Sequence, residues 1–331
     1  MPNIPHTSYE KDLPTSDNAH TLPGQERFVA DTDETGLGAV DAVVDDSAPR
    51  SMWAEAWRYL RRRPLFWISA ILIFIAIVMA LFPQVFSRTD PTFCELANSL
   101  DAPRSGHPFG FDRQGCDIYA RTIYGARASV LVGILTTVAV VCIGTIIGAL
   151  AGFFGGVIDS VLSRIVDIFY AVPLVLAAIV VMQMFKEHRT IITVVVVLAL
   201  FGWTSIARIT RGAVMSVKNE EFVTAAKAVG ASPLRRLCSH ILPNAAAPII
   251  VYATVALGTF IVAEATLSFL GIGLPPTIVS WGADISKAQS SLRSQPMVLF
   301  YPAVALGLTV LSFIMMGDVV RDALDPKSRK K

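Results

Sequence analysis

Six long runs without a charged residue constrain this chain more than any other feature of its sequence. The runs cover residues 64–87, 128–158, 168–185, 190–207, 237–263 and 294–317. The hydrocarbon core of a bilayer is about 30 Å thick, so a helix of roughly 20 apolar residues is needed to cross it. We therefore expect an all-α membrane protein with six transmembrane helices, the first over residues 64–87 and five more in a core of residues 128–320.

Charge is scarce in this chain and unevenly distributed. Charged residues make up 16% of the chain, against about 25% in average soluble proteins. Residues 1–50 hold ten acidic and three basic residues and have no sustained apolar period, which predicts a disordered acidic tail. This tail has neither the basic start nor the apolar segment of a secretory signal.

The distribution of Lys and Arg predicts which side of the membrane each loop faces. If both termini are cytoplasmic, the inner flanks of the six runs hold seventeen Lys and Arg residues and the outer loops hold nine. The rule thus favours a cytoplasmic N-terminus and a cytoplasmic C-terminus, with the basic end 321–331 inside. It puts residues 88–127 outside the cytoplasm and residues 216–244 within it.

The stretch before the first run, residues 51–63, combines aromatic and basic side chains. Trp53 and Trp57 are four residues apart, and several arginines follow closely in sequence. This pattern favours an interfacial basic helix on the inner membrane surface. The alternative is an ordinary positively charged flank of the first span.

Glycines recur at four-residue spacing in the second run, at Gly144, Gly148, Gly152 and Gly156. Glycines with this spacing share one helix face and let another helix approach closely. We expect them to serve packing within the helix bundle. A dimer interface is the alternative.

The uncharged segment 265–283 is interrupted by glycines and prolines, and we expect it to be re-entrant or interfacial, because such backbone must be satisfied by protein or water. Glu264 directly precedes it, and a charge near a span needs a partner. Its carboxylate either pairs with a polar group near an outer gate or reaches the outer surface. Arg164 and Asp167, three residues apart, are expected to form a local ion pair at the start of the third span.

A polar, basic stretch interrupts the apolar chain between the fourth and fifth runs. Asn219 is a suitable cap for a helix that starts at Glu220, and Gly230 suits the left-handed residue at which a helix ends. Ser232 followed by Pro233 is typical of the start of a second helix. The sequence therefore predicts two short helices hinged at Gly230.

The first of these helices carries an apolar stripe formed by Phe222, Ala225, Ala226 and Val229. A helix of about ten residues is too short to be stable alone in water, so the stripe needs a surface to pack against. That surface is either this chain's own membrane domain or the groove of a partner.

The same stretch contains Ala225, Ala226, Gly230, Leu242 and Pro243 at fixed spacings. In these residues it resembles the cytoplasmic coupling loop of ABC importer permeases, whose pattern is Glu-Ala-Ala, three residues, Gly, nine residues and Ile-x-Leu-Pro. Thr224 and His240 stand where that pattern has Glu and Ile. The segments HPFGFDRQGCDIYAR, EATLSFLGIGLPP and GDVVRDALDP are similar to the C-type subunit of the dipeptide and oligopeptide branch. This likeness covers nearly all of residues 52–326.

The resemblance implies a type I ABC importer permease fold and a permease subunit for dipeptides or oligopeptides in the cell (plasma or inner) membrane. Such a subunit forms half of the translocation path. The residues implied to couple this chain to an ATPase are Glu221, Phe222, Thr224, Ala225, Ala226, Lys227, Gly230, Ala231, Arg235 and Arg236. The implied partners are a second related permease, one or two cytoplasmic ATPase subunits, an extracytoplasmic peptide-binding protein and the lipid bilayer, with no nucleic acid. ATP and magnesium would bind to the ATPases, and no cofactor or metal to this chain.

Cys94 and Cys116 both fall in the predicted outer segment. An oxidising exterior permits a disulfide there, which would staple a loop that has little core of its own. Cys116 also stands where the family usually has Arg. Two free thiols are the alternative. Cys142 and Cys238 are expected to be apolar fillers.

Other functional classes have less support in the sequence. It contains no Gly-Lys dipeptide, and hence no GxxxxGK[ST] phosphate loop, and no HExxH or GxSxG motif, so we do not expect an enzyme. A stand-alone secondary transporter would need ion-coupling groups at mid-membrane, and the apolar runs hold almost none. Nickel and glutathione importers share much of the family pattern and are the alternatives for the cargo.

Overall fold

The structure is a computed structural model that describes residues 52–324. The chain divides into two units, Met1–Pro49 and Arg50–Lys331, and the described fold belongs to the second unit. The predicted disordered tail 1–50 and the last part of the predicted basic end, residues 325–331, lie outside the described residues. So does the side chain of Trp53.

Helices connected by loops make up the part of the chain that the structure describes, with a few isolated β-bridges. The α-helices are α1 (Met52–Leu60), α2 (Pro64–Leu81), α3 (Ile118–Phe154), α4 (Gly156–Tyr170), α5 (Leu174–Met184), α6 (Ile191–Gly202), α7 (Thr204–Val217), α8 (Glu221–Ala228), α9 (Pro233–Arg235), α10 (Leu242–Asn244), α11 (Ala246–Phe269), α12 (Trp281–Ala288) and α13 (Met297–Leu324). Short 3₁₀ segments are η1 (Pro83–Val85), η2 (Leu96–Asn98), η3 (Lys186–His188) and η5 (Gln289–Ser291), and η4 (Arg236–Ile241) is a π-helix.

Four of the described helices, α2, α3, α11 and α13, are each long and apolar enough to cross a membrane. Two bent pairs add to them: α4 with α5, at an angle of 78°, and α6 with α7, at 47°. The expected six spans are reached only if each bent pair counts as one span. Four to six spans are therefore compatible with the described helices.

The boundaries of the predicted spans differ from those of the helices. The first span, predicted over 64–87, ends as α2 at Leu81, and three further runs are broken. The run 128–158 ends as a helix at Phe154, and α4 starts after Gly155, whose φ of 67° interrupts the helix. The run 168–185 is broken before Pro173, because proline lacks a backbone N–H and disfavours helical backbone in the preceding residue. The run 190–207 is broken at Trp203.

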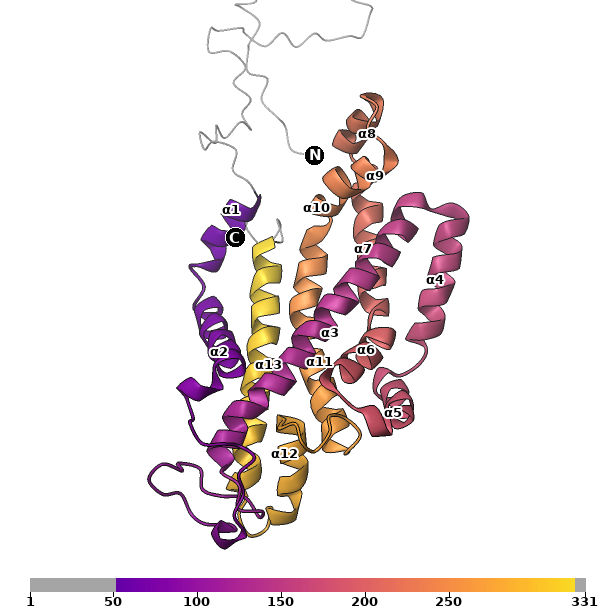
Figure 1. Ribbon diagram of the computed structural model, residues 1–331. Coiled ribbons are helices and arrows are strands. Elements are labelled where there is room, and N and C mark those ends of the chain that lie inside the picture. Colours follow the sequence, from indigo (N-terminus) through magenta and orange to yellow (C-terminus); the bar gives the residue numbers. More distant parts are fainter. Residues whose placement is uncertain (1–51, 325–331) are drawn as a thin grey trace, which may run out of the picture. The chain divides into compact units, whose positions relative to one another are not determined.

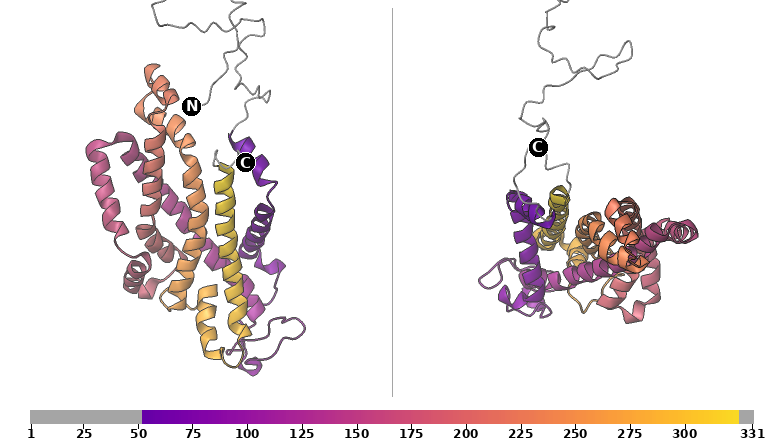
Figure 2. Two further views of the ribbon diagram at one scale, coloured as in Figure 1. Left: turned by 180° about the vertical axis from the view of Figure 1, so that it is seen from behind. Right: turned by 90° about the horizontal axis from the view of Figure 1, so that it is seen from above.

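The short helices and the loop before α3 lie at the two ends of the bundle, and the long helices run between these ends (Figure 1). One end holds α1, the hairpin α8–α10 and the last turn of α13, and the opposite end holds α12 and the loop before α3. Figure 2 shows α3 running obliquely across the other helices. This oblique course lets one helix contact α2, α6, α7, α11 and α13.

Three of the four spaced glycines lie where α3 crosses α7. A side chain on Gly144 would meet Ile206, and a Cβ on Gly152 would lie 2.8 Å from the carbonyl oxygen of Arg211. These glycines serve packing within the bundle, as expected. Gly156 does not join them, because it begins α4 and a Cβ there would have nothing within 4 Å.

Helix α1 packs one side against the end of α13. Ala56 is buried in a cluster with Ala323 and Leu324, while Trp57 is exposed. This arrangement leaves an aromatic and basic side free. The position of α1 on a membrane surface stays a prediction.

The segment 265–283 comprises the last turn of α11, a loop and the first turn of α12. Gly271 has a φ of 73°, and Leu274 and Trp281 are buried. The loop therefore folds back onto the bundle, as the glycines and prolines predict.

Candidate functional site

The hairpin begins with α8, one residue later than predicted. Glu220 has extended backbone and occupies the cap position without a side-chain cap hydrogen bond. The prediction that Asn219 caps this helix was therefore wrong. The carboxylate of Glu221 lies in the first turn, where the helix dipole favours negative charge.

Gly230 ends α8 in the left-handed conformation, with a φ of 86°. The N–H of Ala231 donates to the carbonyl of Ala226 at 3.0 Å, and the N–H of Gly230 donates to that of Lys227 at 3.1 Å. These two bonds form a Schellman motif. Ser232 then caps α9 by accepting from the N–H of Arg235 at 3.4 Å. The predicted hinge is confirmed in this geometry.

The apolar residues of α8 divide between two faces. Val223 and Ala226 are buried in a cluster with Leu237 and Ile241. Because residues three apart share a helix face, Val223 and Ala226 together form the inward face of α8, and Phe222 lies outside it. The single stripe predicted over Phe222, Ala225, Ala226 and Val229 was therefore wrong.

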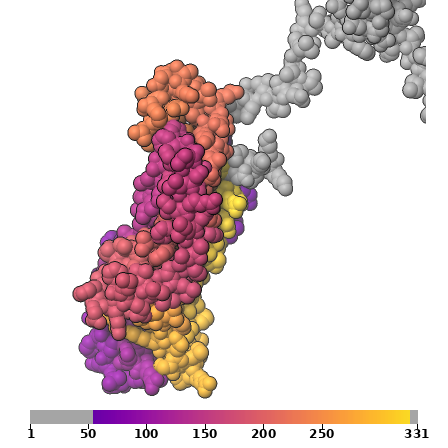
Figure 3. Space-filling view, turned by 90° about the vertical axis from the view of Figure 1, so that its right-hand side faces the viewer, coloured from indigo at the N-terminus to yellow at the C-terminus, as the bar shows by residue number. Residues whose placement is uncertain are grey.

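The outward face of the hairpin exposes large apolar side chains. Phe222 is 43% exposed, Leu234 66% and Val229 86%. Figure 3 shows the hairpin, in orange, as the outermost part of one end of the described unit. One face of the hairpin therefore packs on this chain's own membrane domain, and the other face is exposed.

The remaining residues of the predicted coupling loop lie mainly on the surface. Those with exposed side chains are Glu221, Thr224, Ala225, Lys227 and Arg235. Ala231 and Arg236 are half-buried. The guanidinium of Arg236 lies 5.6 Å from the ring centroid of Phe153, a cation–π contact that ties the hairpin to the end of α3.

Ion pairs connect α4 to α7. Arg208 donates to Asp167 at 2.8 Å, and Arg211 donates to both carboxylate oxygens of Asp159 at 2.5 and 2.7 Å. The predicted pair of Arg164 and Asp167 is present at 4.0 Å, but both side chains are exposed. The closer partner of Asp167 comes from a different helix, which local spacing does not reveal.

Glu264 is fully buried near the C-terminal end of α11. Its carboxylate accepts hydrogen bonds from Ser129 at 2.8 Å and from Ser268 at 2.7 Å. Ser268 Oγ in turn accepts from the N–H of Leu274 at 3.2 Å. The alternative in which Glu264 reaches the outer surface was wrong, and the carboxylate instead joins α3, α11 and the following loop.

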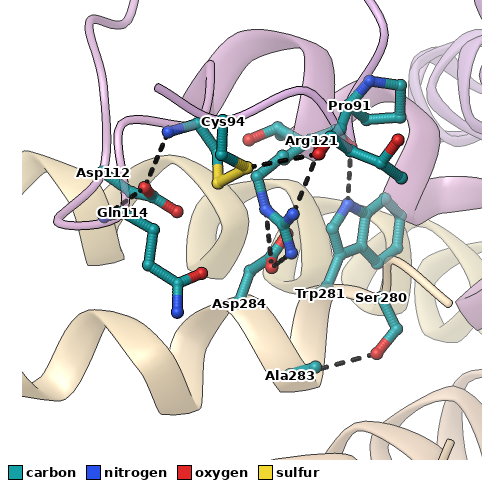
Figure 4. Close-up of polar contacts among 12 residues, drawn as sticks. Pro91, Cys94, Asp112, Gln114, Arg121, Ser280, Trp281, Ala283 and Asp284 are labelled. Atoms are coloured by element: carbon teal, nitrogen blue, oxygen red, sulfur yellow. Dashed lines mark hydrogen bonds and ion pairs between the residues drawn. A yellow bond between two sulfur atoms is a disulfide. The ribbon is translucent and has the colours of Figure 1, made fainter. Parts of the chain in front are cut away.

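A second polar cluster lies at the end opposite the hairpin, where the loop before α3 meets α12 (Figure 4). The structure has Cys94 and Cys116 joined in the disulfide that the sequence favoured. Arg121 Nε donates to Asp284 Oδ1 at 3.0 Å, and Arg121 Nη1 donates to the carbonyl of Pro91 at 3.1 Å.

The ion pair of Arg121 and Asp284 was missed by the sequence analysis. Both side chains are buried, and burial raises the pKa of Asp284 while the Arg121 guanidinium opposes that rise. Trp281 is fully buried beside them and donates from Nε1 to the carbonyl of Thr122 at 2.8 Å. In the sequence, both residues are seen only as charges that flank apolar runs, and this pattern does not indicate which charged residues form a pair.

Two family matches cover most of the chain. Residues 144–330 match the family of binding-protein-dependent transport system inner membrane components. Residues 51–103 match the N-terminal TM domain of oligopeptide transport permease C. The chain belongs to this permease family. An exposed hairpin beside membrane-length helices is consistent with that membership.

Curated relatives match this permease over most of their length. The oligopeptide transport system permease protein OppC of Bacillus subtilis (strain 168) is 40% identical over 88% of this chain and 95% of its own. The dipeptide transport system permease protein DppC of Alkalihalophilus pseudofirmus is 37% identical over 84% and 91%. The glutathione transport system permease protein GsiD of Escherichia coli O6:K15:H31 is 36% identical over 89% and 96%.

A solved structure shares the fold. A chain of the inward-facing MetNI methionine ABC transporter matches with a TM-score of 0.52 and 19% identity, over 62% of this chain and 96% of that chain. This likeness shows that the described helices adopt the fold of an ABC importer permease.

Proposed function

We propose that this permease is a subunit of an ATP-driven importer for dipeptides or oligopeptides and forms half of its translocation path. The cargo is supported by the match of residues 51–103 to oligopeptide permease C and by the names of the relatives OppC and DppC. The relative GsiD keeps glutathione as the second candidate cargo.

The observation that carries the proposal is the outward face of the hairpin, defined by Phe222, Val229 and Leu234. Exposed apolar side chains that gather on a polar element mark a site of protein interaction. An ATPase subunit that covers this face would move it when ATP is bound and hydrolysed. The buried face, through Val223, would pass that movement to α3 and α7.

The remaining parts of the importer are supplied by other chains. A second related permease completes the path, one or two ATPase subunits bind ATP and magnesium, and an extracytoplasmic peptide-binding protein delivers the cargo. The hairpin, α1 and the end of α13 share one end of the bundle. We place that end in the cytoplasm, with both termini, because Lys and Arg are concentrated there.

The test is the double variant Phe222→Ser/Val229→Ser in the assembled importer. We expect peptide uptake into proteoliposomes, and co-purification of the ATPase, to fall by about tenfold or more, as for the central apolar residues of an interface. Leu96→Ser is the matched control, because Leu96 is equally apolar and exposed but lies in the loop before α3. Unchanged uptake and co-purification in the double variant would refute the coupling role.

Competition for uptake separates the candidate cargoes. Unlabelled dipeptides, tripeptides and pentapeptides are expected to compete with a labelled peptide, whereas glutathione is expected to compete weakly. Competition by glutathione alone would move the assignment to glutathione import.

A further inference from the structure

A cavity of about 160 Å³ lies beside the ion pair of Arg121 and Asp284. Its wall comes from the disulfide-linked loop, α3, α12, η5 and the start of α13. The charged residues of the wall are Asp112, Arg113, Arg121, Asp284 and Lys287, and Thr122 and Ser291 add hydroxyl groups to it. None of them belongs to the hairpin, so the cavity is separate from the coupling site.

Three buried polar atoms of this wall have no hydrogen-bond partner within residues 52–324: Asp284 Oδ2, Thr122 Oγ1 and Ser291 Oγ. Their residues are only 9%, 5% and 2% exposed, respectively. Buried polar groups in folded proteins are almost always hydrogen-bonded. Unbonded groups from three different elements around one cavity therefore indicate a ligand that bonds to them.

The charges around the cavity define the chemistry of that ligand. Asp284 Oδ1 is occupied by Arg121, which leaves Oδ2 to accept from a positively charged donor. Lys287 lies one turn further along α12, and in the described part of the chain its ammonium group forms neither a hydrogen bond nor an ion pair. Partial burial lowers the pKa of Lys287 and Arg121 lowers it further, while Asp284 and Asp112 raise it. Its ammonium group lines the cavity and is open to an anion.

A bare metal ion fits this site poorly, because three cationic side chains, Arg113, Arg121 and Lys287, line the cavity beside only two carboxylates, Asp112 and Asp284. The described residues contain no cluster of His, Cys, Asp and Glu that could hold a metal. The volume also excludes large ligands, since pockets for drug-sized molecules measure about 300–1,000 Å³. The ligand is therefore small and carries both a cationic donor and an anionic acceptor.

We propose that this cavity binds a small free α-amino acid. Its α-ammonium group donates to Asp284 Oδ2 and to the hydroxyls of Thr122 and Ser291, and its α-carboxylate accepts from Lys287 Nζ. Only the placement of the cavity on the extracytoplasmic side depends on the proposed function, and the binding itself does not. The site would let the permease sense extracellular amino acids, the products of peptide hydrolysis.

The experiment is calorimetric titration of L-alanine into the full chain in lipid nanodiscs. We expect saturable binding, and binding about tenfold weaker for N-acetylalanine and for alaninamide, each of which lacks one of the two charges. The dipeptide Ala-Ala is expected to bind about tenfold more weakly as well, because a peptide unit separates its ammonium group from its carboxylate, so that the two charges no longer match the spacing of the site. The proposal would be overturned if alanine did not bind at concentrations up to about 10 mM, or if any of the three analogues bound with the same affinity as alanine.

Variants locate the binding within the cavity. Lys287→Met and Ser291→Ala are expected to weaken alanine binding while leaving the melting temperature unchanged, because neither side chain has a bonded partner to lose. Lys186→Met is the matched control, since Lys186 lies in η3 and does not line the cavity. Asp284→Asn is avoided because it would also release Arg121. Unaltered alanine binding by Lys287→Met would show that alanine does not bind in this cavity. The proposed function is tested separately, by peptide uptake in the assembled importer.

Discussion

At the scale of single residues, the packing of α3 against α7 depends on glycine. Gly148 of α3 faces α7, where a Cβ would collide with the carbonyl oxygen of Ala207 and lie 2.8 Å from Thr210 Cβ. Lipid provides no hydrophobic drive for two helices to associate, so close packing of this kind holds them together. The backbone carbonyl cannot move aside without a shift of α7.

We predict that Gly148→Ala lowers the free energy of unfolding by about 1–3 kcal/mol, the usual cost of overpacking. The measurement is thermal or denaturant unfolding of the purified chain in detergent. Gly212→Ala in α7 is the matched control, because its Cβ would have nothing within 4 Å. In that control the free energy of unfolding is expected to stay the same or to rise by up to about 1 kcal/mol, since Ala favours helix more than Gly. Equal losses in both variants would contradict the packing role.

At the scale of elements, the hairpin acts through the angle between α8 and the segment that follows it. Gly230 sets this angle with its left-handed backbone and its bond to Lys227. Its Cβ position is open, with nothing within 4 Å. The constraint on residue 230 is therefore conformational and not steric.

Gly230→Pro is accordingly expected to abolish peptide uptake while membrane insertion survives. Proline fixes φ near −65° and removes the N–H that donates to Lys227, so α8 loses its orientation. Gly230→Asn is the control, because Asn adopts the left-handed region more readily than other side chains, and it should retain most of the uptake. The readouts are uptake in proteoliposomes and the amount of chain in the membrane fraction. Normal uptake by Gly230→Pro would show that the hinge is dispensable.

At the scale of the whole described unit, the two ends differ in chemistry. The free thiol of Cys238 is exposed within the hairpin, and the disulfide of Cys94 and Cys116 lies at the opposite end. A disulfide is stable in an oxidising exterior and a free thiol in a reducing cytoplasm. The two cysteine states agree with the orientation that the basic residues favour.

This orientation predicts sided labelling of Cys238. In a Cys142→Ser background, a membrane-impermeant maleimide should label the chain in inside-out vesicles and leave it unlabelled in right-side-out vesicles. After reduction of the disulfide, labelling of the exposed Cys94 from the outside provides the internal control. Labelling of Cys238 from the outside would reverse the proposed topology.

Local signals in the sequence determined the helical membrane class, the hinge at Gly230 and the cap at Ser232. They also determined the close packing of the glycines in α3, because helix periodicity, capping and left-handed backbone depend on a few neighbouring residues. Pro173 is itself a local signal for a break, but the uniform hydrophobicity around it concealed that signal. The break at Trp203 carried a weaker local signal.

Only the tertiary structure decided which distant groups meet. Arg208 pairs with a residue 41 positions away, and Arg121 pairs with one 163 positions away. The split of α8 into an inward face at Val223 and an outward face at Phe222 also depends on where the π-helix η4 lies beside it. Such contacts follow from the angles at which helices cross, and neither composition nor periodicity of a single helix specifies those angles.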